Sequence, residues 1–378
     1  MIKPARLGFV PALWLCLPLG AAAAEPNLFY SRLHDALQKY EALQETSNWP
    51  SVAPGPRLQA GDAGPRVAAL RQRLLAESDL PDAEDAGSND SFDAGLQQAL
   101  MRFQKRHGLT VDGVVGPVTL AALNIPLASR VAQMRINLRR MNDLELTPTG
   151  IVIVINVPAY ELLWLEDQKV AWHTRVQVGS PETPTPLFKS ELRQIVVNPS
   201  WAIPRSIAVE EMLPLIQDDP DYLGERNIEV FDNDGLRVAE DTIEWSMLSP
   251  ARFPYKLIQK PGALNSLGRV KFIFPNAYDV YLHDTPHRIL FEQSRRAFSH
   301  GCIRAEHSLD LARRLLQADG WGNAAAERVL NSPQSHNIGL TVKPLVAIVY
   351  WTAFVDSDGA MQFRNDIYGH DIGDEAQR

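Results

Sequence analysis

A cysteine and three histidines lie close together in the C-terminal part of the chain. His283 ends an apolar run, the fifteen residues Asp284–Phe298 follow, and the stretch Ser299-His300-Gly301-Cys302-Ile303-Arg304 comes next. A thiol attacks a carbonyl carbon as the thiolate, and a neighbouring imidazolium can lower the thiol pKa from about 8.5 into a range of about 3.5–7.5. The pattern therefore predicts nucleophilic chemistry at Cys302, provided that the fold brings a histidine against it.

Of the three histidines, His283 is the strongest candidate for the base. It closes an apolar strand, where backbone hydrogen bonding fixes the position of its ring. His300 stands two residues before Cys302, too close along an extended chain to face the sulfur, and His287 falls in a predicted loop. We therefore expect His283 to be the general base and Cys302 the nucleophile.

The residues beside Cys302 suit the same chemistry. Gly301 has no Cβ, which lets the backbone N–H groups of Gly301 and Cys302 turn toward a developing oxyanion. Arg304 follows Cys302 by two residues, so it shares a face with Cys302 in an extended chain. There it could bind a substrate carboxylate through two hydrogen bonds, and a salt bridge that holds the loop is the alternative.

A metal site is the competing interpretation of the same region, because His283, Asp284, His287 and His300 lie close together in the sequence. Zinc needs ligands that converge at about 2.0–2.3 Å. His283 and His287 flank Pro286, so they cannot share a regular helix face. We expect neither a metal nor a cofactor.

The N-terminal third is predicted to be helical, because its apolar residues recur at helical spacing. The turn Gly61–Gly64 and the loop Asp112–Thr119 separate three short helices, which suits a small binding module at residues 56–127, with a helical spacer as the alternative. The predicted helices cover residues 28–45, a segment after Gly64, residues 92–107, 117–123 and 128–142.

From residue 149 the pattern changes to short strands at close spacing, which favours an antiparallel sheet. The predicted strands cover residues 151–157, 160–165, 171–178, 194–198, 270–274, 280–283 and one long apolar strand at 342–354. A helical pattern at 206–217 and an acidic stretch at 218–250 interrupt the series. We interpret residues 199–268 as an insertion over the sheet, and residues 309–318 as a helix.

The N-terminus has the pattern of an export signal. Lys3 and Arg6 precede the apolar run Leu7–Leu19, and Ala22-Ala23-Ala24 provides a small-residue cleavage site. Residues 1–24 are predicted to be removed, with an uncleaved anchor as the alternative, and residues 25–55 form a helical segment and linker. Cys302 is then the one cysteine of the exported chain, so no intramolecular disulfide can form. A buried, inert thiol is the alternative to a reactive one.

The charge balance bears on partners. The chain has 37 basic and 45 acidic residues, a formal charge of −8, and loss of Lys3 and Arg6 makes it −10. This argues against nucleic acid and against an anionic membrane surface.

Taken together, His283, the fifteen-residue gap, and Ser299-His300-Gly301-Cys302 with Arg304 resemble the signature of the L,D-transpeptidases with a YkuD-type catalytic domain. The resemblance covers about residues 30–370. Further matching stretches are Asn198-Pro199-Ser200-Trp201, Ile203-Pro204-Arg205, Pro261-Gly262, Asn265–Gly268, Lys271-Phe272, Gln362–Tyr368 and, in the module, Asp112-Gly113 with Gly116-Pro117-Val118-Thr119.

The resemblance implies a fold and a reaction. The fold is multidomain α+β: a mainly antiparallel β catalytic domain at 149–378 with a helical capping insertion, preceded by a three-helix peptidoglycan-binding-like domain and a connecting helix at 128–148. The reaction is a periplasmic acyl transfer. Cys302 is acylated by the third residue of a peptidoglycan tetrapeptide stem, D-alanine leaves, and an acceptor amine makes a 3→3 cross-link. Carbapenems are expected to acylate the same thiol.

The resemblance also implies roles for neighbouring side chains. A backbone carbonyl near Asp284 is expected to orient the base. Tyr281 is expected to contact substrate. Ser299 and His300 are expected either to shape the loop or to contact substrate. Trp201 is expected either to belong to a hydrophobic lid or to bind substrate.

Two further functions stay open. The same Cys–His pair could act as an L,D-carboxypeptidase or another hydrolase, which differs only in the acceptor. A non-catalytic wall-binding protein is the alternative from another class. The protein partners are not specified by the sequence.

Overall fold

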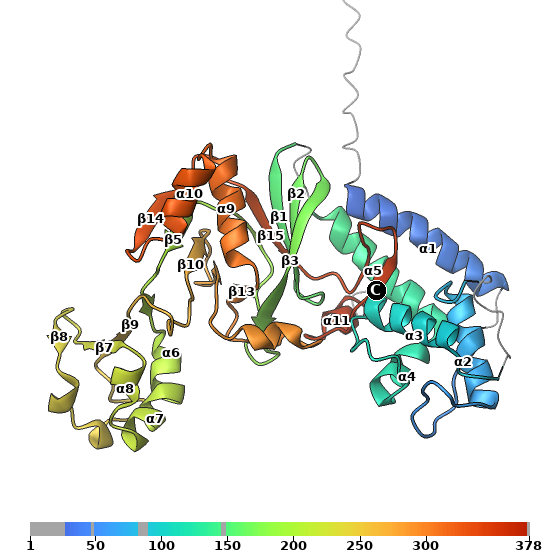
Figure 1. The fold of residues 1–378 in the computed structure, drawn as a ribbon, viewed down its shortest axis with the longest axis horizontal. Helices are drawn as coiled ribbons and strands as arrows, with labels where there is room; N and C mark the ends of the chain where they lie inside the picture. Colours follow the sequence, from blue (N-terminus) through green and yellow to red (C-terminus); the bar gives the residue numbers. More distant parts are fainter. Residues whose placement is uncertain (1–26, 47–48, 82–89, 145–148, 376–378) are drawn as a thin grey trace, which may run out of the picture.

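The computed structural model describes residues 27–46, 49–81, 90–144 and 149–375 (Figure 1). The predicted export signal at residues 1–24 lies outside these ranges. A β-rich domain stands in the middle of the molecule, with the N-terminal helices on one side and the insertion on the other (Figure 1). Within the described ranges, no helix combines the length and the apolar composition needed to cross a membrane.

Five helices make up the N-terminal part. Pro65 and Pro117 open α2 and α4 at a position where proline's missing N–H costs no hydrogen bond. Asp93 caps α3 by accepting a hydrogen bond of 2.8 Å from the Leu96 N–H. The module's own core includes Leu70, Leu96 and Phe103. The bounds are α1 (Leu28–Thr46), α2 (Pro65–Ala76), α3 (Ala94–Arg106), α4 (Pro117–Leu123) and α5 (Leu127–Asn142).

A curled, mostly antiparallel sheet forms the body of the second domain, which confirms the predicted fold class. Three of its strand pairs are parallel: β1 with β15, β11 with β13, and β12 with β3. The strand order is β14-β5-β10-β11-β13-β3-β2-β1-β15-β4. The bounds are β1 (Ile151–Asn156), β2 (Glu161–Glu166), β3 (Lys169–Gly179), β4 (Lys189–Glu191), β5 (Gln194–Val197), β10 (Val270–Ile273), β11 (Leu282–His283), β12 (Ala297–Ser299), β13 (Ile303–Ala305), β14 (His336–Gly339) and β15 (Leu345–Val349).

Helices cover both faces of this sheet. On one face, α9 (Ser308–Ala318) and α10 (Asn323–Leu330) pack against Phe272, Leu282 and Ile303, all fully buried. On the other face of β1, β2 and β15, α1 and α5 form a second core. The turn Asp167-Gln168 joins β2 to β3 with positive φ at both residues, as a tight hairpin requires.

Residues 199–268 form a unit with its own apolar core, which includes Leu213, Ile228 and Leu257. The predicted helix at 206–217 is present, with one π-helical turn in it. The sequence indicated only a helical cap, yet the unit also contains a four-stranded antiparallel sheet in the order β6-β9-β7-β8. The bounds are β6 (Trp201–Ala202), α6 (Arg205–Ile207), η2 (Ala208–Met212), α7 (Leu213–Asp218), α8 (Tyr222–Glu225), β7 (Ile228–Phe231), β8 (Arg237–Val238), η3 (Glu240–Thr242), η4 (Trp245–Met247) and β9 (Lys256–Gln259).

The prediction of one long strand at 342–354 is wrong. The segment divides into β15 and β16 (Ala353–Val355), because two backbone N–H groups between them bond to side-chain amides instead of a strand. The Trp351 N–H donates to Asn156 Oδ1 and the Thr352 N–H to Asn137 Oδ1, each at 2.9 Å. After β16 the chain turns back as β17 (Met361–Phe363) and ends in α11 (His370–Glu375); η5 (Arg288–Glu292) precedes β12.

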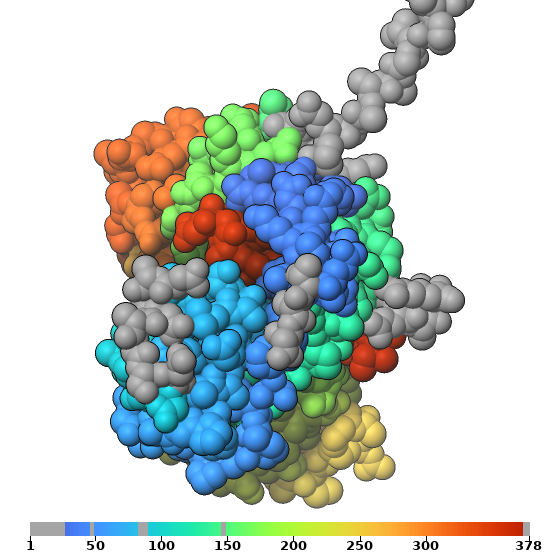
Figure 2. Space-filling view, turned by 90° about the vertical axis from the view of Figure 1, so that its right-hand side faces the viewer, coloured from blue at the N-terminus to red at the C-terminus, as the bar shows by residue number. Residues whose placement is uncertain are grey.

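The C-terminal segment joins the two domains. It lies between α1 and the module in Figure 2, where it appears red between two blue regions. Arg364 Nη1 donates a hydrogen bond of 2.8 Å to the Arg106 carbonyl oxygen in α3. Phe363 packs against the His107 ring at 5.4 Å between centroids, and the Arg130 guanidinium of α5 lies 4.4 Å from the Phe363 ring centroid. The module is therefore held against the β-rich domain by buried contacts.

Replacing Leu282 tests the packing beneath β11. Leu282→Ala removes a fully buried side chain, so we expect the free energy of unfolding to fall by about 2–5 kcal/mol. Urea denaturation followed by tryptophan fluorescence measures it. Leu236→Ala, at a side chain that is 67% exposed, is the control and should change the free energy by less than about 0.5 kcal/mol. Equal losses in both variants would contradict this account.

Candidate active site

Four polar side chains form a row across neighbouring strands of the sheet. Lys271 on β10 stands opposite His283 on β11, and His283 stands opposite Arg304 on β13. Arg304 in turn stands opposite Gln177 on β3. Residues directly opposite each other project from the same face of a sheet, so this row faces away from the core under α9.

Tyr281 and Cys302 extend the site along the same two strands. Each stands two residues before a member of the row, so it shares that face. The Ile303 N–H donates to the Tyr281 carbonyl oxygen at 3.1 Å, which aligns the two segments. The Tyr281 N–H also hydrogen-bonds to the Cys302 sulfur. The parallel pairing of β11 with β13 thus sets the predicted base and nucleophile on adjacent strands of one face.

The His283 ring is held in one orientation. Its Nδ1 lies 2.6 Å from the Asp284 carbonyl oxygen. A carbonyl oxygen only accepts, so Nδ1 carries the proton and Nε2 keeps a lone pair. The pKa of His283 is lowered to about 3, chiefly by burial and to a smaller extent by the Arg304 and Lys271 cations, while the hydrogen bond to the Asp284 carbonyl opposes this shift. The imidazole is therefore neutral at physiological pH.

Asp284 is itself fixed by its carboxylate. Oδ1 accepts from Ser308 Oγ at 2.8 Å and from Arg288 Nη2 at 2.7 Å, and Oδ2 accepts from the Arg269 N–H at 2.8 Å. Gly268 approaches it so closely that a Cβ there would meet Asp284 Oδ2 at 2.4 Å. These contacts hold the backbone whose carbonyl orients the base.

Cys302 is half-buried and keeps its proton. Burial raises the pKa of the thiol, and the Tyr281 N–H, the Lys271 ammonium and Arg304 offset this only in part. The sequence suggested that an imidazolium would lower the thiol pKa. In the structure the thiol is instead protonated and the imidazole neutral, so the proton must leave the sulfur as the bond to carbon forms.

The loop before Cys302 is shaped by Ser299 and Gly301. The buried Ser299 Oγ donates to the Cys302 carbonyl oxygen at 2.5 Å and accepts from the Gly301 N–H at 3.2 Å. Thr185 Oγ1 donates to the Gly301 carbonyl oxygen at 2.8 Å. Gly301 has φ +103°, a conformation that L side chains rarely adopt. The glycine thus serves the turn, while its N–H, which we expected at an oxyanion, bonds to Ser299; the Cys302 N–H remains the candidate donor.

Two cations stand in the site without a carboxylate beside them. Arg304 Nη1 lies 3.3 Å from Gln177 Oε1, whereas its buried Nε has no hydrogen-bond partner among the described residues. Lys271 Nζ lies 3.6 Å from the Tyr281 ring centroid, and burial lowers its pKa. No ion pair of Arg304 occurs within the described ranges, so the alternative of a loop-holding salt bridge lacks a partner there.

The insertion reaches the site through two residues. Trp201 on β6 hydrogen-bonds to the Tyr281 side chain and packs against the insertion's core. His300 Nε2 lies 2.7 Å from Glu211 Oε1 in η2, with both side chains half exposed. His300 therefore contacts the insertion, a role that neither sequence interpretation included. The described residues contain no group of three His, Cys, Asp or Glu side chains placed to hold a metal ion.

Comparison with known proteins identifies two domains in the chain. Residues 150–336 match the family model described as "L,D-transpeptidase catalytic domain", and residues 63–123 match the one described as "Putative peptidoglycan binding domain". Residues 150–336 form an L,D-transpeptidase catalytic domain.

Two named proteins are similar to parts of the chain. A protein of Haemophilus influenzae named "Putative L,D-transpeptidase" is 36% identical over 219 residues, which is 58% of this chain and 44% of that protein. An N-acetylmuramoyl-L-alanine amidase of Bacillus licheniformis is 38% identical over 74 residues, 19% of this chain and 20% of the amidase. The chain thus spans less than half the length of either relative.

Among solved structures, the L,D-transpeptidase of Xylanimonas cellulosilytica is 19% identical to this chain. The superposition covers 78% of this chain and 99% of that one, with a TM-score of 0.22. At this score the structural likeness adds nothing to the assignment made from the family models.

Three residues of the candidate site were given no role in the sequence analysis. Lys271 and Gln177 belong to the cross-strand row, and Glu211 binds His300 from the insertion. Strand alternation in residues 270–273 shows that Lys271 faces away from Phe272. It does not give the register that sets Lys271 opposite His283. The contact of Glu211 with His300 could not be predicted, because no sequence feature near Glu211 indicates which distant residue it meets.

The protonated state of Cys302 is testable by alkylation. Iodoacetamide reacts with the thiolate, so a raised thiol pKa predicts a rate that rises about tenfold per pH unit between pH 6 and 8. Intact-mass analysis after timed quenching gives the rate, and Cys302→Ser corrects for reaction at Cys16. A thiolate–imidazolium pair would give a plateau from pH 6 upward, and that profile would overturn the neutral resting state.

Proposed function

We propose that this chain is an L,D-transpeptidase of the peptidoglycan layer. Cys302 takes the acyl group of the third residue of a tetrapeptide stem and passes it to an acceptor amine, which forms a 3→3 cross-link. The observation that carries the proposal is the pairing of β11 with β13. It sets His283, oriented by the Asp284 carbonyl, on the strand next to the Cys302 thiol.

The reaction follows from the neutral pair. As the Cys302 sulfur attacks the stem carbonyl carbon, its proton moves to His283 Nε2, which leaves an oxyanion on the former carbonyl oxygen. The Cys302 N–H would stabilise this charge by donating a hydrogen bond to it. When the oxyanion collapses, the C–N bond to D-alanine breaks, and the imidazolium returns the proton to the leaving amine. A thioester on Cys302 remains.

The second half repeats these steps with another nucleophile. His283 takes a proton from the acceptor amine as the amine attacks the thioester carbon. The C–S bond then breaks, and the proton returns to the sulfur. A low histidine pKa suits both halves, because the base must be free at the start of each one.

Arg304 and Lys271 suit a donor that bears carboxylates. Both cations are largely removed from water, and a buried cation without an anion is costly. A stem-peptide carboxylate beside Arg304 would supply the missing charge through charge-assisted hydrogen bonds. This favours substrate binding over loop support for Arg304. Trp201 and Tyr281 would form the wall of the donor site nearest the insertion.

Location and inhibitors follow from the same proposal. An enzyme with a peptidoglycan-binding domain works at the wall, so we propose export through residues 1–24 to the periplasm. A carbapenem would acylate Cys302 by ring opening and remain bound as a thioester. Hydrolysis by the same Cys–His pair is the second candidate function, favoured wherever water reaches the thioester before an amine.

Acylation and transfer are tested together by mass spectrometry. We expect meropenem to add its mass once to the wild type and not to Cys302→Ser. With purified tetrapeptide muropeptides, 3→3 dimers and free D-alanine should form. Tripeptides alone would establish the hydrolase, and no acylation by meropenem together with retained binding to sacculi would establish a non-catalytic protein.

Arg304→Ala tests carboxylate recognition. Loss of hydrogen bonds to a charged group costs about 1.5–3 kcal/mol, so kcat/KM for the tetrapeptide donor should fall about ten- to a hundredfold. Arg304→Lys should keep part of the activity. The control is a donor whose carboxylates are amidated, for which wild type and Arg304→Ala should be equally slow. A variant that unfolds at lower temperature and loses both donors alike would instead show a structural role.

A further inference from the structure

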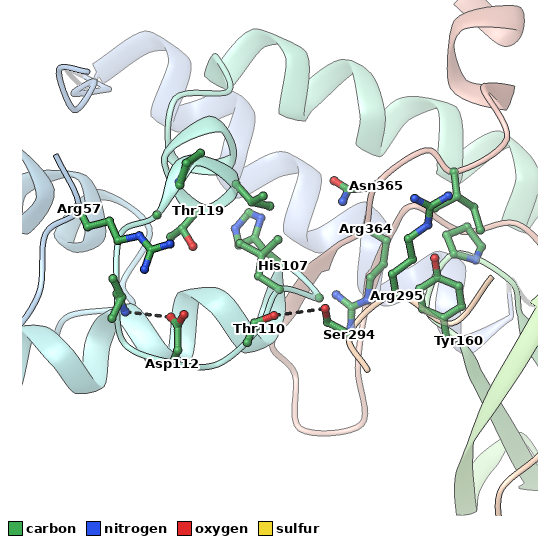
Figure 3. A pocket seen from close by; sticks show the side chains of 18 of the residues that line it. Arg57, His107, Thr110, Asp112, Thr119, Tyr160, Ser294, Arg295, Arg364 and Asn365 are labelled. Carbon is green, nitrogen blue, oxygen red and sulfur yellow. Dashed lines mark hydrogen bonds between the residues drawn. The ribbon is translucent and has the colours of Figure 1, made fainter. Parts of the chain in front are cut away.

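A cavity opens at the junction of the module and the transpeptidase domain. Its volume is about 670 Å³, within the range of pockets that hold small ligands. The module contributes Arg57 and the loop from Gly108 to Thr119, and the transpeptidase domain contributes Tyr160, Ser294 and Arg295 (Figure 3). The two groups lie on opposite sides, so neither domain forms this cavity alone. Cys302 and His283 are not among its lining residues.

The cavity is basic although the chain is acidic. The protein carries 45 acidic against 37 basic residues. Among the described residues the lining nevertheless holds Arg57, Arg295 and Arg364, with Asp112 as the one acidic side chain. Asp112 Oδ1 already accepts hydrogen bonds from Gln104 Nε2 at 2.7 Å and from the Val114 N–H at 2.9 Å. The Asp112 carboxylate is therefore hydrogen-bonded within its own loop. The arginines outnumber it and make the electrostatic potential of the cavity positive.

The three arginines differ in whether their guanidinium groups are available to bind a ligand. Arg364 is committed to the domain junction through the Arg106 carbonyl oxygen and Gln362. Arg57 and Arg295 are exposed, and no ion pair of either occurs within the described ranges. They stand at the two ends of the cavity in Figure 3. Separate guanidinium groups at each end fit an extended ligand with more than one carboxylate, rather than a single small anion.

The walls between these ends combine apolar side chains, such as Val114 and Ile367, with hydroxyl groups. Thr110 Oγ1 of the module lies 3.3 Å from Ser294 Oγ of the transpeptidase domain, and this pair spans the junction (Figure 3). The Tyr160 backbone has φ +55°, which is uncommon for an aromatic residue, and Arg296 Nη2 donates to its carbonyl oxygen at 3.2 Å. Hydroxyls, backbone groups and one aromatic ring can meet the amides of a peptide between its charged ends.

The cavity is connected to the catalytic loop by the chain itself. Ser294 and Arg295 stand just before β12, which ends at Ser299. From the other side, Ile367 lines the cavity and is followed by Tyr368, whose hydroxyl donates to the Gly179 carbonyl oxygen at 2.7 Å. The Thr185 N–H donates to the same hydroxyl at 3.2 Å, and Thr185 Oγ1 donates to the Gly301 carbonyl oxygen. A ligand in this cavity is therefore connected through Tyr368 and Thr185 to the nucleophile loop, residues 299–302.

We propose that this interdomain cavity binds a carboxylate-bearing stem peptide of peptidoglycan, at a site built jointly by the module and the transpeptidase domain and separate from the catalytic donor site. The proposal rests on the proposed function in taking the wall as the ligand. Arg57 and Arg295 bind the carboxylates, and Thr110, Ser294 and Tyr160 contact the peptide between them. The module thus holds the wall in contact with the catalytic domain, not at a distance from it.

The test uses the full chain with its catalytic thiol blocked. Wild type is acylated with meropenem, acylation is verified by intact mass, and calorimetry measures binding of a disaccharide tripeptide. Arg57→Glu/Arg295→Glu should weaken binding at least tenfold and remove most of its salt dependence. The matched control Lys105→Glu/Arg139→Glu changes the charge equally at two exposed positions outside the cavity and should bind within twofold of wild type. Both variants should be acylated at the wild-type rate.

Other outcomes decide against the proposal. Unchanged affinity in Arg57→Glu/Arg295→Glu, or an equal loss in the control, would overturn it. Equal binding of chitotetraose would overturn the stem-peptide assignment in favour of the glycan. Equal binding of a disaccharide tripeptide with amidated carboxylates would overturn the carboxylate recognition assigned to Arg57 and Arg295. If the charge-reversed variant does not fold, Arg57→Gln/Arg295→Gln gives the same test with a smaller loss. If meropenem fails to acylate the wild type, the proposed function is at fault, and the binding comparison is then made on the unacylated protein.

Discussion

The parallel pairing of β11 with β13 is the constraint on which the candidate site depends. It sets His283 opposite Arg304, and with it Tyr281 and Cys302 on one face of the sheet. A slip of one residue would turn His283 and Cys302 into the core and bring Leu282 and Ile303 to the surface. The apolar cost of that exchange, about 1.5–3 kcal/mol for each side chain, fixes the register. The core under α9 therefore positions the chemistry on the opposite face.

Asp284 imposes a second constraint, because its carboxylate fixes the local backbone and its carbonyl oxygen orients His283. The carboxylate is satisfied by Ser308, Arg288 and the Arg269 N–H, which come from three separate segments. The carbonyl is thereby held still and fixes the His283 tautomer. Because the orienting group is a neutral carbonyl, it does not raise the histidine pKa as a carboxylate would, and burial beside two cations lowers it. Neutrality of both members of the pair follows from this arrangement.

Much of the fold was readable from the sequence, because helical stripes and β-branched runs report local periodicity. The start of α2 follows the predicted turn Gly61–Gly64, and α4 covers the predicted residues 117–123. The hairpin between the predicted strands 160–165 and 171–178 turns at Asp167-Gln168. The predictions that failed concern segments whose structure depends on contacts with residues distant in the sequence. The predicted strand at 342–354 is broken by two asparagine side chains that are distant in the sequence but hydrogen-bond to the Trp351 and Thr352 N–H groups. The insertion's strands are two to four residues long, too short for alternation to show. For the candidate site, the sequence indicated His283 and Cys302 but not Lys271, because register is a property of paired strands.

The junction between the domains has consequences for how the two halves of the molecule can act together. If the module were a tether on a flexible linker, binding the wall would only raise the local concentration of substrate. Here Arg364 and Phe363 of the C-terminal segment pack into the module, while Tyr368 of the same segment reaches Gly179 and, through Thr185, the Gly301 carbonyl. One short stretch of chain thus contacts the module, lines the interdomain cavity and is linked through Thr185 to the loop that precedes Cys302. A stem peptide in that cavity would stiffen this stretch, and the geometry of Gly301, which needs positive φ, depends on the same contacts.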